Sequence, residues 1–313
     1  MTALQKPEIL AIGEPMIEFN QVGGAGSRNY LQGFGGDTSN FAIAAARQGA
    51  RSAYFTRLGD DMYGQLLRDL WAREGVDASA VESDPDAFTG IYFVTHGETG
   101  HQFSFFRTGS AASRMHPIHL PLAMIRGVRV LHVSGISFAI SASAADTCYA
   151  AIEAARAAGV MVSFDTNLRL RLWSKDRARG VMSDVIGLAD ICLPSYDDVV
   201  VITGLTDPEK LVDFCLERGA RIVALKLGAD GAIIADHTQR IRIGPHRCNA
   251  VDATGAGDVF GGAFIARLLA GDDLAAAGLY ASVAAALSTE GYGAVEPIPT
   301  AEKVRRTLVG ASL

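Results

Sequence analysis

The sequence lacks the features that would place it in several functional classes. It has no block rich in lysine and arginine, and its formal net charge is −6. An acidic balance of this kind argues against a nucleic-acid-binding surface. The longest uncharged runs, such as residues 274–289, are shorter than the roughly 20 apolar residues that a membrane-spanning helix needs. The first residues, MTALQKPEILAIGEP, do not have signal-peptide architecture. We therefore expect a soluble cytoplasmic protein with neither nucleic acid nor membrane as a partner.

Cysteine is scarce, and its spacing excludes two further classes. The chain has four cysteines, and none of them forms a CxxC pair. The spacing fits neither a zinc site nor a dense disulfide framework. We expect buried free thiols in a reducing compartment. They are Cys148, Cys192, Cys215 and Cys248.

Two common nucleotide-binding motifs are also absent. The P-loop pattern GxxxxGK[ST] cannot occur, because the chain contains no Gly-Lys pair. The dinucleotide fingerprint GxGxxG does not follow the first expected strand. Any nucleotide must therefore be held by another kind of backbone cradle.

The chain does contain a regular alternation of apolar runs of strand length and alanine-rich segments with helical spacing. Expected strands cover residues 8–13, 52–59, 129–134, 160–164, 189–193 and 221–226. Expected helices cover residues 38–50, 62–75, 142–158, 176–187, 208–218, 258–270 and 273–289, with a final helix near the C-terminus. This alternation predicts an α/β fold with a mostly parallel central sheet flanked by helices.

Two segments interrupt this alternation. Residues 14–36 mix an apolar run with glycines, and residues 88–107 have β-type composition with a turn at HGETG. Together they predict a small inserted β-sheet, made from about residues 14–36 and 87–115, within a single domain that spans residues 1–313. Such a sheet is expected to serve as a lid or as the contact surface of a homodimer.

The stretch DATGAGDVFGGAF, residues 252–264, carries the strongest chemical signal. Amides near Gly255, Ala256 and Gly257 could cradle negative oxygens, and the helix expected to follow would add its positive N-terminal dipole. Phosphoryl transfer needs this charge stabilisation and benefits from a base beside the attacking hydroxyl. Asp258 is placed to be that base. The alternative is that Asp258 only caps the helix after a glycine turn.

This stretch resembles the C-terminal signature of the ribokinase/PfkB family of sugar kinases. The resemblance implies a ribokinase-like fold and the use of ATP and Mg²⁺. It implies that Asp258 is the catalytic base and that Gly255, Ala256 and Gly257 form the anion hole. Asp252 matches the acidic residue that opens the motif, where it helps to fix the turn and the metal–phosphate region.

A second stretch, GFGGDTSNFAIAAARQGA at residues 33–50, is similar to the glycine-pair signature with which the same family holds its sugar. Gly35 and Gly36 would let a ligand approach the backbone, and Asp37 and Asn40 could bond its hydroxyls. The GGDTSN pattern resembles 2-keto-3-deoxygluconate kinases more than other members. The alternative is a glycine turn followed by a Thr38 helix cap.

Further matching segments imply contacts with a sugar acid. In FFRTGSAAS and FDTNLRLRLW, Arg107 could grip a carboxylate through paired hydrogen bonds, and Arg169 is a second cation for that carboxylate or for the transferring phosphate. The alternative for either residue is an ordinary surface arginine. Tyr92 matches a lid position that contacts substrate in the resembling kinases, and Phe106 is expected beside it. Residues 103–106 read FSFF where the keto-acid kinases often have tyrosines, which could shift the substrate preference.

The resemblance also implies a nucleotide site at the carboxyl ends of the expected strands. KLGADGA would turn the chain beneath the nucleotide, with a plain strand–turn–strand as the alternative. The family commonly carries Asn-x-x-Glu where this chain has PSYDDV, so Asp198 would act on a metal through water, and Asp252 is a second candidate. The expected nucleotide-binding residues, besides the cradle, are Asn167, Ser195, Lys226, Gly228, Gly231 and Ser288.

The resemblance spans nearly the whole chain and implies ATP-dependent phosphorylation of 2-keto-3-deoxygluconate at its 6-hydroxyl. A neutral-sugar kinase of the same family, of fructokinase or ribokinase type, is the nearest alternative. A nucleoside kinase has only the shared signatures in its favour. A non-catalytic sugar-sensing relative is a further alternative, against which the intact Asp258 and glycine cradle argue.

Overall fold

The structure is a computed structural model that describes residues 6–24, 26–97 and 100–310. Its central sheet consists of β1 (Ile9–Ile12), β4 (Ser52–Phe55), β9 (Val130–Ser134), β10 (Met161–Asp165), β11 (Ile191–Cys192), β12 (Ile222–Lys226), β13 (Ala232–Asp236) and β14 (Arg240–Ile243). The strand order is β14-β13-β12-β11-β10-β9-β1-β4. All neighbours from β4 to β12 run parallel, and β13 and β14 are antiparallel. The predicted α/β fold with a mostly parallel sheet is confirmed.

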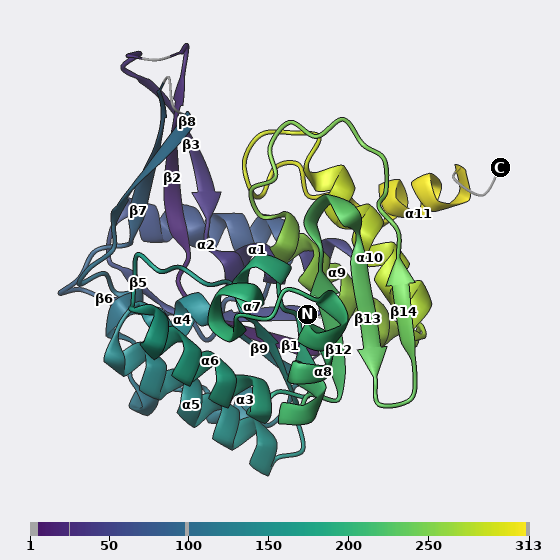
Figure 1. Ribbon diagram of the computed structural model, residues 1–313. Helices are drawn as coiled ribbons and strands as arrows, with labels where there is room; N and C mark the ends of the chain where they lie inside the picture. Colours follow the sequence, from purple (N-terminus) through teal and green to yellow (C-terminus); the bar gives the residue numbers. More distant parts are fainter. Residues whose placement is uncertain (1–5, 25, 98–99, 311–313) are drawn as a thin grey trace.

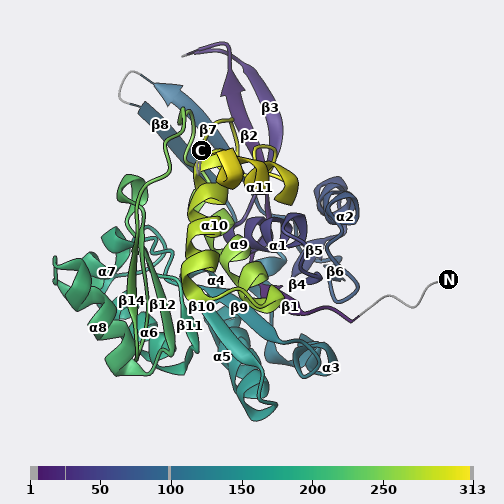
Figure 2. The same ribbon diagram turned by 90° about the vertical axis from the view of Figure 1, so that its right-hand side faces the viewer.

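Helices cover both faces of this sheet (Figure 2). The core beneath one face is built with α3 (Leu122–Ile125), α4 (Gly135–Ala139), α5 (Ala142–Ala157), α6 (Lys175–Leu188), α7 (Tyr196–Thr203) and α8 (Pro208–Arg218). The other face packs against α1 (Asp37–Arg47), α2 (Met62–Glu74), α9 (Ala256–Ala270), α10 (Leu274–Ser288) and α11 (Ala301–Gly310). Leu10 and Ile12 of β1 join the first core, while Ile9 and Ala11 join the second. Because both faces are buried, this strand is a continuous apolar run.

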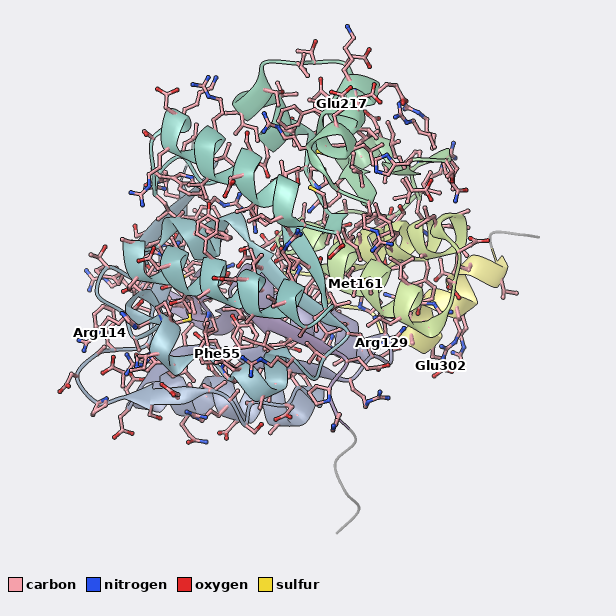
Figure 3. All side chains as sticks on the ribbon, turned by 90° about the horizontal axis from the view of Figure 1, so that it is seen from below. Phe55, Arg114, Arg129, Met161, Glu217 and Glu302 are labelled. Atoms are coloured by element: carbon pink, nitrogen blue, oxygen red, sulfur yellow. The ribbon has the colours of Figure 1, made fainter. Side chains whose placement is uncertain are left out.

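Buried and exposed side chains separate as this layering requires. Seen from below, Phe55 lies in the packed interior, whereas Arg114 and Glu302 lie at the rim (Figure 3). All four cysteines are free; Cys248 is partly buried and the other three are buried, as expected for structural thiols. Within the described residues, no helix combines the length and the apolar character needed to cross a membrane.

A separate four-stranded sheet projects from the body and is called the lid below (Figure 1). It contains β2 (Met16–Val22), β3 (Asn29–Gly35), β7 (Ile91–Gly97) and β8 (Gly100–Phe106), in the order β3-β2-β7-β8. The predicted small sheet apart from the central one is therefore confirmed. The turn predicted at HGETG includes residues 98–99, which lie outside the described residues.

The structure differs from the sequence-based expectation at residues 52–59, which do not form one strand. After β4 the chain leaves the central sheet, and β5 (Arg57–Gly59) pairs in parallel with β6 (Glu82–Asp84). The apolar pattern could not reveal this change of partner. Helix α7 and strand β14 were also not predicted, because both are short.

Helices α1 and α9 pack at backbone contact, and this sets the position of the site described below. A Cβ atom placed on Gly262 of α9 would lie 2.5 Å from the Phe41 carbonyl oxygen and 2.8 Å from the Ala44 Cβ. A side chain at this position would therefore force the two helices apart. The second glycine pair of the GAGDVFGG stretch thus has a packing role.

We predict that Gly262→Ala destabilises the fold by about 1–3 kcal/mol, because the added methyl overpacks the α1–α9 contact. Gly180→Ala is the matched control. Gly180 is exposed on α6 and a Cβ there meets nothing within 4 Å, so this change should stabilise the helix by about 0.5–1 kcal/mol. Urea unfolding of both variants measures the difference. Equal stability of the two variants would refute the packing argument.

Candidate active site

Several of the sequence-predicted residues meet where the carboxyl ends of the parallel strands face the N-termini of α1 and α9. This edge is where open α/β sheets bind ligands. The contributing strand ends are those of β10 and β12, and the lid rises from the neighbouring end of β1 (Figure 1).

The turn before α9 is fixed by Asp252. Its Oδ1 accepts hydrogen bonds from the Thr254 amide (2.9 Å) and hydroxyl (2.6 Å), and its Oδ2 accepts one from the Gly293 amide (2.9 Å). Gly255 is the N-cap residue of α9 with a left-handed φ of 78°, which glycine adopts without steric cost. The helix begins at Ala256, whose amide donates to the Ala253 carbonyl (3.2 Å). The N-terminal dipole of α9 therefore opens directly behind this turn.

Asp258 lies inside the first turn of α9 and faces α1. Its Oδ2 accepts a hydrogen bond of 2.8 Å from Asn40 Nδ2. The alternative that Asp258 is the helix cap is wrong, because Gly255 occupies the N-cap position. Burial, followed by the negative charge of Asp37, holds the pKa of Asp258 well above its ordinary value. The carboxylate therefore has the raised basicity that a general base needs.

The first turn of α1 presents Asp37 and Asn40 to the same space. Gly36 is the N-cap of α1, and the Thr38 hydroxyl bonds Tyr54 (2.8 Å), so the alternative of a Thr38 cap is also wrong. Asn40 is only 3% exposed, and among the described residues its Oδ1 has no hydrogen-bond partner. A buried amide oxygen without a donor is costly unless a ligand supplies one.

An ion pair between two strand ends adds a cation to the site. Lys226 Nζ at the end of β12 lies 2.5 Å from Asp165 Oδ2 at the end of β10. A Cβ atom placed on Gly257 would lie 3.4 Å from Lys226 Nζ, so the cation borders the cradle. Burial raises the pKa of Asp165, and Lys226 opposes that rise. Ser195 forms a backbone bridge to Lys226, which places it beside this pair.

The loop after β10 ties the two halves of the site together. Asn167 has a positive φ of 30°, and its Nδ2 donates to Asp37 Oδ2 (2.8 Å). Asp198 Oδ2 accepts from the Thr166 hydroxyl (2.9 Å) and the Leu168 amide (3.1 Å). Both predicted residues therefore support the shape of this loop.

Two buried carboxylates at the base of the lid were missed by sequence reasoning. Glu14 pairs with Arg107 and accepts a hydrogen bond from Ser110 (2.9 Å), and Tyr92 donates one to Glu18 (2.5 Å). Burial raises the pKa of each carboxyl group. The signal that could have revealed them is the presence of acidic residues within the apolar stretch GEPMIEF.

The strand register separates the residues of the lid into an inner and an outer face. Phe105 pairs with Tyr92 across β7 and β8 and stacks on its ring (5.4 Å), and the Arg107 guanidinium lies 5.6 Å from the Phe105 ring. Phe106 projects from the opposite, outer face and is 55% exposed. This placement argues against a substrate contact by Phe106 and favours Phe105 in its place.

The remaining predicted residues occupy varied positions. Gly35 packs against Tyr92, and Arg169 is exposed on the loop after β10. Gly228 and Gly231 bound the short turn between β12 and β13, both with positive φ. Ser288 is buried and its hydroxyl donates to the Ala285 carbonyl (2.7 Å), so its side chain is used inside α10.

A cavity of about 440 Å³ opens between the inner face of the lid and the loop after α10. Its lid side includes Glu18, Asn20 and His96, and its other wall includes Tyr292 and Ala294. Ala294 also touches Gly255, since a Cβ atom there would lie 3.1 Å from the Ala294 Cβ. Ala294 therefore lies between the cavity and the cradle. Within the described residues, no three His, Cys, Asp or Glu side chains form a metal-binding group.

Comparison with known proteins agrees with this geometry. The model of the "pfkB family carbohydrate kinase" matches residues 6–301. The chain is 33% identical to 2-dehydro-3-deoxygluconokinase of Thermoproteus tenax, with 96% of this chain and 94% of that protein covered. It is 31% identical to probable fructokinase-4 of Arabidopsis thaliana, with 98% of both covered.

Solved structures give the same result for the fold. A putative ribokinase II from E. coli, in complex with ATP and Mg²⁺, superposes with a TM-score of 0.90 at 26% identity, covering 97% of this chain and 99% of that one. The family model establishes the family. The two relatives named above are a 2-dehydro-3-deoxygluconokinase and a probable fructokinase, so the comparisons do not decide the substrate. The chain belongs to the pfkB family of carbohydrate kinases.

Proposed function

We propose that this kinase transfers the γ-phosphoryl group of ATP to the 6-hydroxyl of 2-keto-3-deoxygluconate, which yields 2-keto-3-deoxy-6-phosphogluconate and ADP. The observation that carries the transfer step is the Asp258 carboxylate, held by Asn40 at the N-terminus of α9 behind a glycine turn. The relative from Thermoproteus tenax supports the choice of substrate. Arg107 at the base of the lid supports it as well, because guanidinium pairs with carboxylate.

The proposed reaction uses the groups in a fixed order. Asp258 accepts the proton of the 6-hydroxyl. At the same time the hydroxyl oxygen forms a bond to the γ-phosphorus, and the bond from the γ-phosphorus to the bridging oxygen of ADP breaks. Amides of the Gly255–Gly257 turn, the dipole of α9 and the Lys226 cation stabilise the negative charge that accumulates. Asn40 Oδ1 is a suitable acceptor for a sugar hydroxyl, because it has no partner among the described residues. Closure of the lid would exclude water.

Magnesium fits this site as an ion held mainly by water and nucleotide phosphates. Mg²⁺ in kinases commonly uses only one or two carboxylates, and a protein cage of three or more such ligands is absent from the described residues. Asp198 is the residue that would hold it through water. When bound, the ion neutralises charge on the phosphate oxygens. For Asp252 we propose only the turn-fixing role, because both its oxygens already accept hydrogen bonds.

We predict that Asp258→Asn lowers kcat by about 10²–10⁴ while nucleotide affinity stays unchanged, because the amide cannot accept the proton. In the unchanged enzyme, kcat/KM should fall with decreasing pH at a higher pH than for an ordinary aspartate, since the pKa of Asp258 is raised. A coupled ADP-release assay with and without sugar, and calorimetric titration with ATP, measure the two quantities. Near-normal kcat in the variant would remove Asp258 from the mechanism, and no sugar-dependent ADP release from the unchanged chain would indicate a non-catalytic relative.

A neutral-sugar kinase of fructokinase type is the second candidate, and a specific observation favours it. Arg107 is already paired with the buried Glu14, and Glu18 places another carboxylate on the inner face of the lid. Both carboxylates would repel an acidic substrate. The Arabidopsis relative named as a fructokinase is similar over the same length.

We predict that Arg107→Ala raises KM for 2-keto-3-deoxygluconate by about 10–100-fold and leaves KM for fructose nearly unchanged, since a charged hydrogen bond contributes about 1.5–3 kcal/mol. Arg107→Lys should have an intermediate effect because it keeps a cation beside Glu14. Arg114→Ala, which removes an exposed arginine paired with Asp84, is the control. Steady-state kinetics with both sugars decide between the candidates: an equal effect on both would exclude a carboxylate contact.

The outer face of the lid supports a proposed homodimer. Tyr30 and Phe106 are 38% and 55% exposed, and both rings make edge contacts with Phe93 between them. A second copy of the same face would cover this aromatic cluster. A stable interface of this kind buries roughly 1,200–2,000 Å² in total.

We predict that the double variant Tyr30→Ser, Phe106→Ser converts the dimer to a monomer, because it removes the aromatic centre of the contact. Ile118→Ser is the control, since Ile118 is 80% exposed away from the lid. Light scattering coupled to size-exclusion chromatography gives the molar mass. A dimer that persists in the double variant, or an unchanged chain that is already monomeric, would exclude this surface as the contact.

A further inference from the structure

The lid is joined to the body by four connections, and Glu14 lies where they meet. The described connections are residues 13–15 before β2, Gly36 after β3, residues 85–90 before β7, and residues 107–111 after β8. Glu14 belongs to the first connection and contacts the other three. Its side chain is fully buried.

The contacts of Glu14 with each connection are short. The carboxylate pairs with Arg107 and accepts the Ser110 hydroxyl, both in the connection after β8. A Cβ atom placed on Gly90 would lie 3.2 Å from Glu14 Oε1. A Cβ atom placed on Gly36 would lie 2.5 Å from the Glu14 carbonyl oxygen. One acidic residue thus contacts every chain crossing between lid and body.

The ion pair between Glu14 and Arg107 also determines the net charge at the Arg107 side chain. The side chain of Arg107 is 10% exposed, and its Nε has no hydrogen-bond partner among the described residues. The guanidinium is therefore held in place by Glu14 through Nη2, while Nε makes no hydrogen bond among the described residues. Because Glu14 cancels its charge, an arriving carboxylate meets a nearly neutral pair instead of a free cation. Asp37 lies close enough to add negative potential.

We propose that Glu14 is a positioning residue that determines substrate specificity: it fixes Arg107 at the junction of the lid connections and reduces its charge, which limits the preference for carboxylated over neutral sugars. This inference rests on the proposed function, in which Arg107 contacts the substrate carboxylate. Glu14 itself does not touch the reacting atoms. Its effect should appear in the ratio of kcat/KM for an acidic and a neutral sugar.

Two substitutions of Glu14 separate the effect of its charge from the effect of its shape. Glu14→Gln keeps the shape and an acceptor for Arg107 but removes the charge, so the ratio of kcat/KM for 2-keto-3-deoxygluconate to that for fructose should rise about 10-fold. Glu14→Asp keeps the charge, so its ratio should stay near that of the unchanged enzyme. Glu8→Gln is the matched control, because Glu8 also pairs with an arginine, Arg51, at 3.2 Å, and it precedes β1, at the end of that strand opposite to Glu14. Thermal unfolding verifies that each variant is folded.

The unchanged enzyme provides an independent measurement. Burial raises the pKa of Glu14 above its ordinary value, so its negative charge is lost at a higher pH than that of an ordinary glutamate. The acid-to-neutral ratio should therefore rise as the pH is lowered through this range, while the substrate carboxylate, with a pKa of about 3.5, stays ionised. The charged or titratable groups that face Glu14 are Arg107, Asp37 and Tyr54. Titration of Asp258 affects both substrates alike and cancels in the ratio. The Glu14→Gln ratio should be flat over the same range.

Each outcome decides the inference. A raised, pH-independent ratio in Glu14→Gln alone supports it. A ratio unchanged in Glu14→Gln, or changed equally in Glu14→Asp, overturns it in favour of a purely structural role. If Glu14→Gln does not fold, a flat pH series of the unchanged enzyme overturns it and a rising one supports it. If the unchanged enzyme accepts only fructose, the proposed function fails, and the inference is then tested by the inhibition constant of the keto acid against fructose, which should fall in Glu14→Gln.

Discussion

The hydrogen bond between Asn40 and Asp258 joins the first turns of two helices that are distant in sequence, and the rest of the site depends on it. It can form only because α1 and α9 pack at backbone contact, and Gly262 makes that contact possible. The same approach brings the N-terminal dipoles of both helices to one edge of the sheet. Asp37 accepts a hydrogen bond from Asn167 on the loop after β10, so the GGDTSN segment and the strand ends form one connected network.

This network concentrates negative charge in a buried part of the fold, where repulsion between carboxylates lowers stability. Asp37, Asp165 and Asp258 lie close enough for their charges to oppose one another, and Lys226 is the cation that compensates them. Burial is the larger cause of the raised pKa of Asp165 and Asp258, and the repulsion adds to it. Residues that cost stability in this way persist when the strain serves function. A base with high proton affinity beside a cradle for anions is what phosphoryl transfer requires.

The sequence predicted the parts of this arrangement that are local. The alternation of strands and helices, the separate small sheet and the family membership are confirmed, because each depends on short-range patterns or contiguous motifs. The split of residues 52–59 between two sheets depends on pairing partners that no local pattern contains. The outward position of Phe106 depends on strand register, since a shift by one residue reverses the face. The partner of Arg107 is Glu14, which lies far from it in the sequence.

The contact between Glu14 and Arg107 bears on the choice between an acidic and a neutral sugar in the proposed function. In the proposed mechanism the glycine cradle and Asp258 act on the phosphoryl group and the reacting hydroxyl, so they do not distinguish an acidic from a neutral sugar. Under the proposal made here, discrimination between an acid and a neutral sugar depends on the net charge beneath the lid, which Arg107 raises and Glu14 and Glu18 lower. A single change in one of these three side chains alters that balance and leaves the transfer groups intact. Under this proposal, substrate choice in this chain is an electrostatic property of the lid junction.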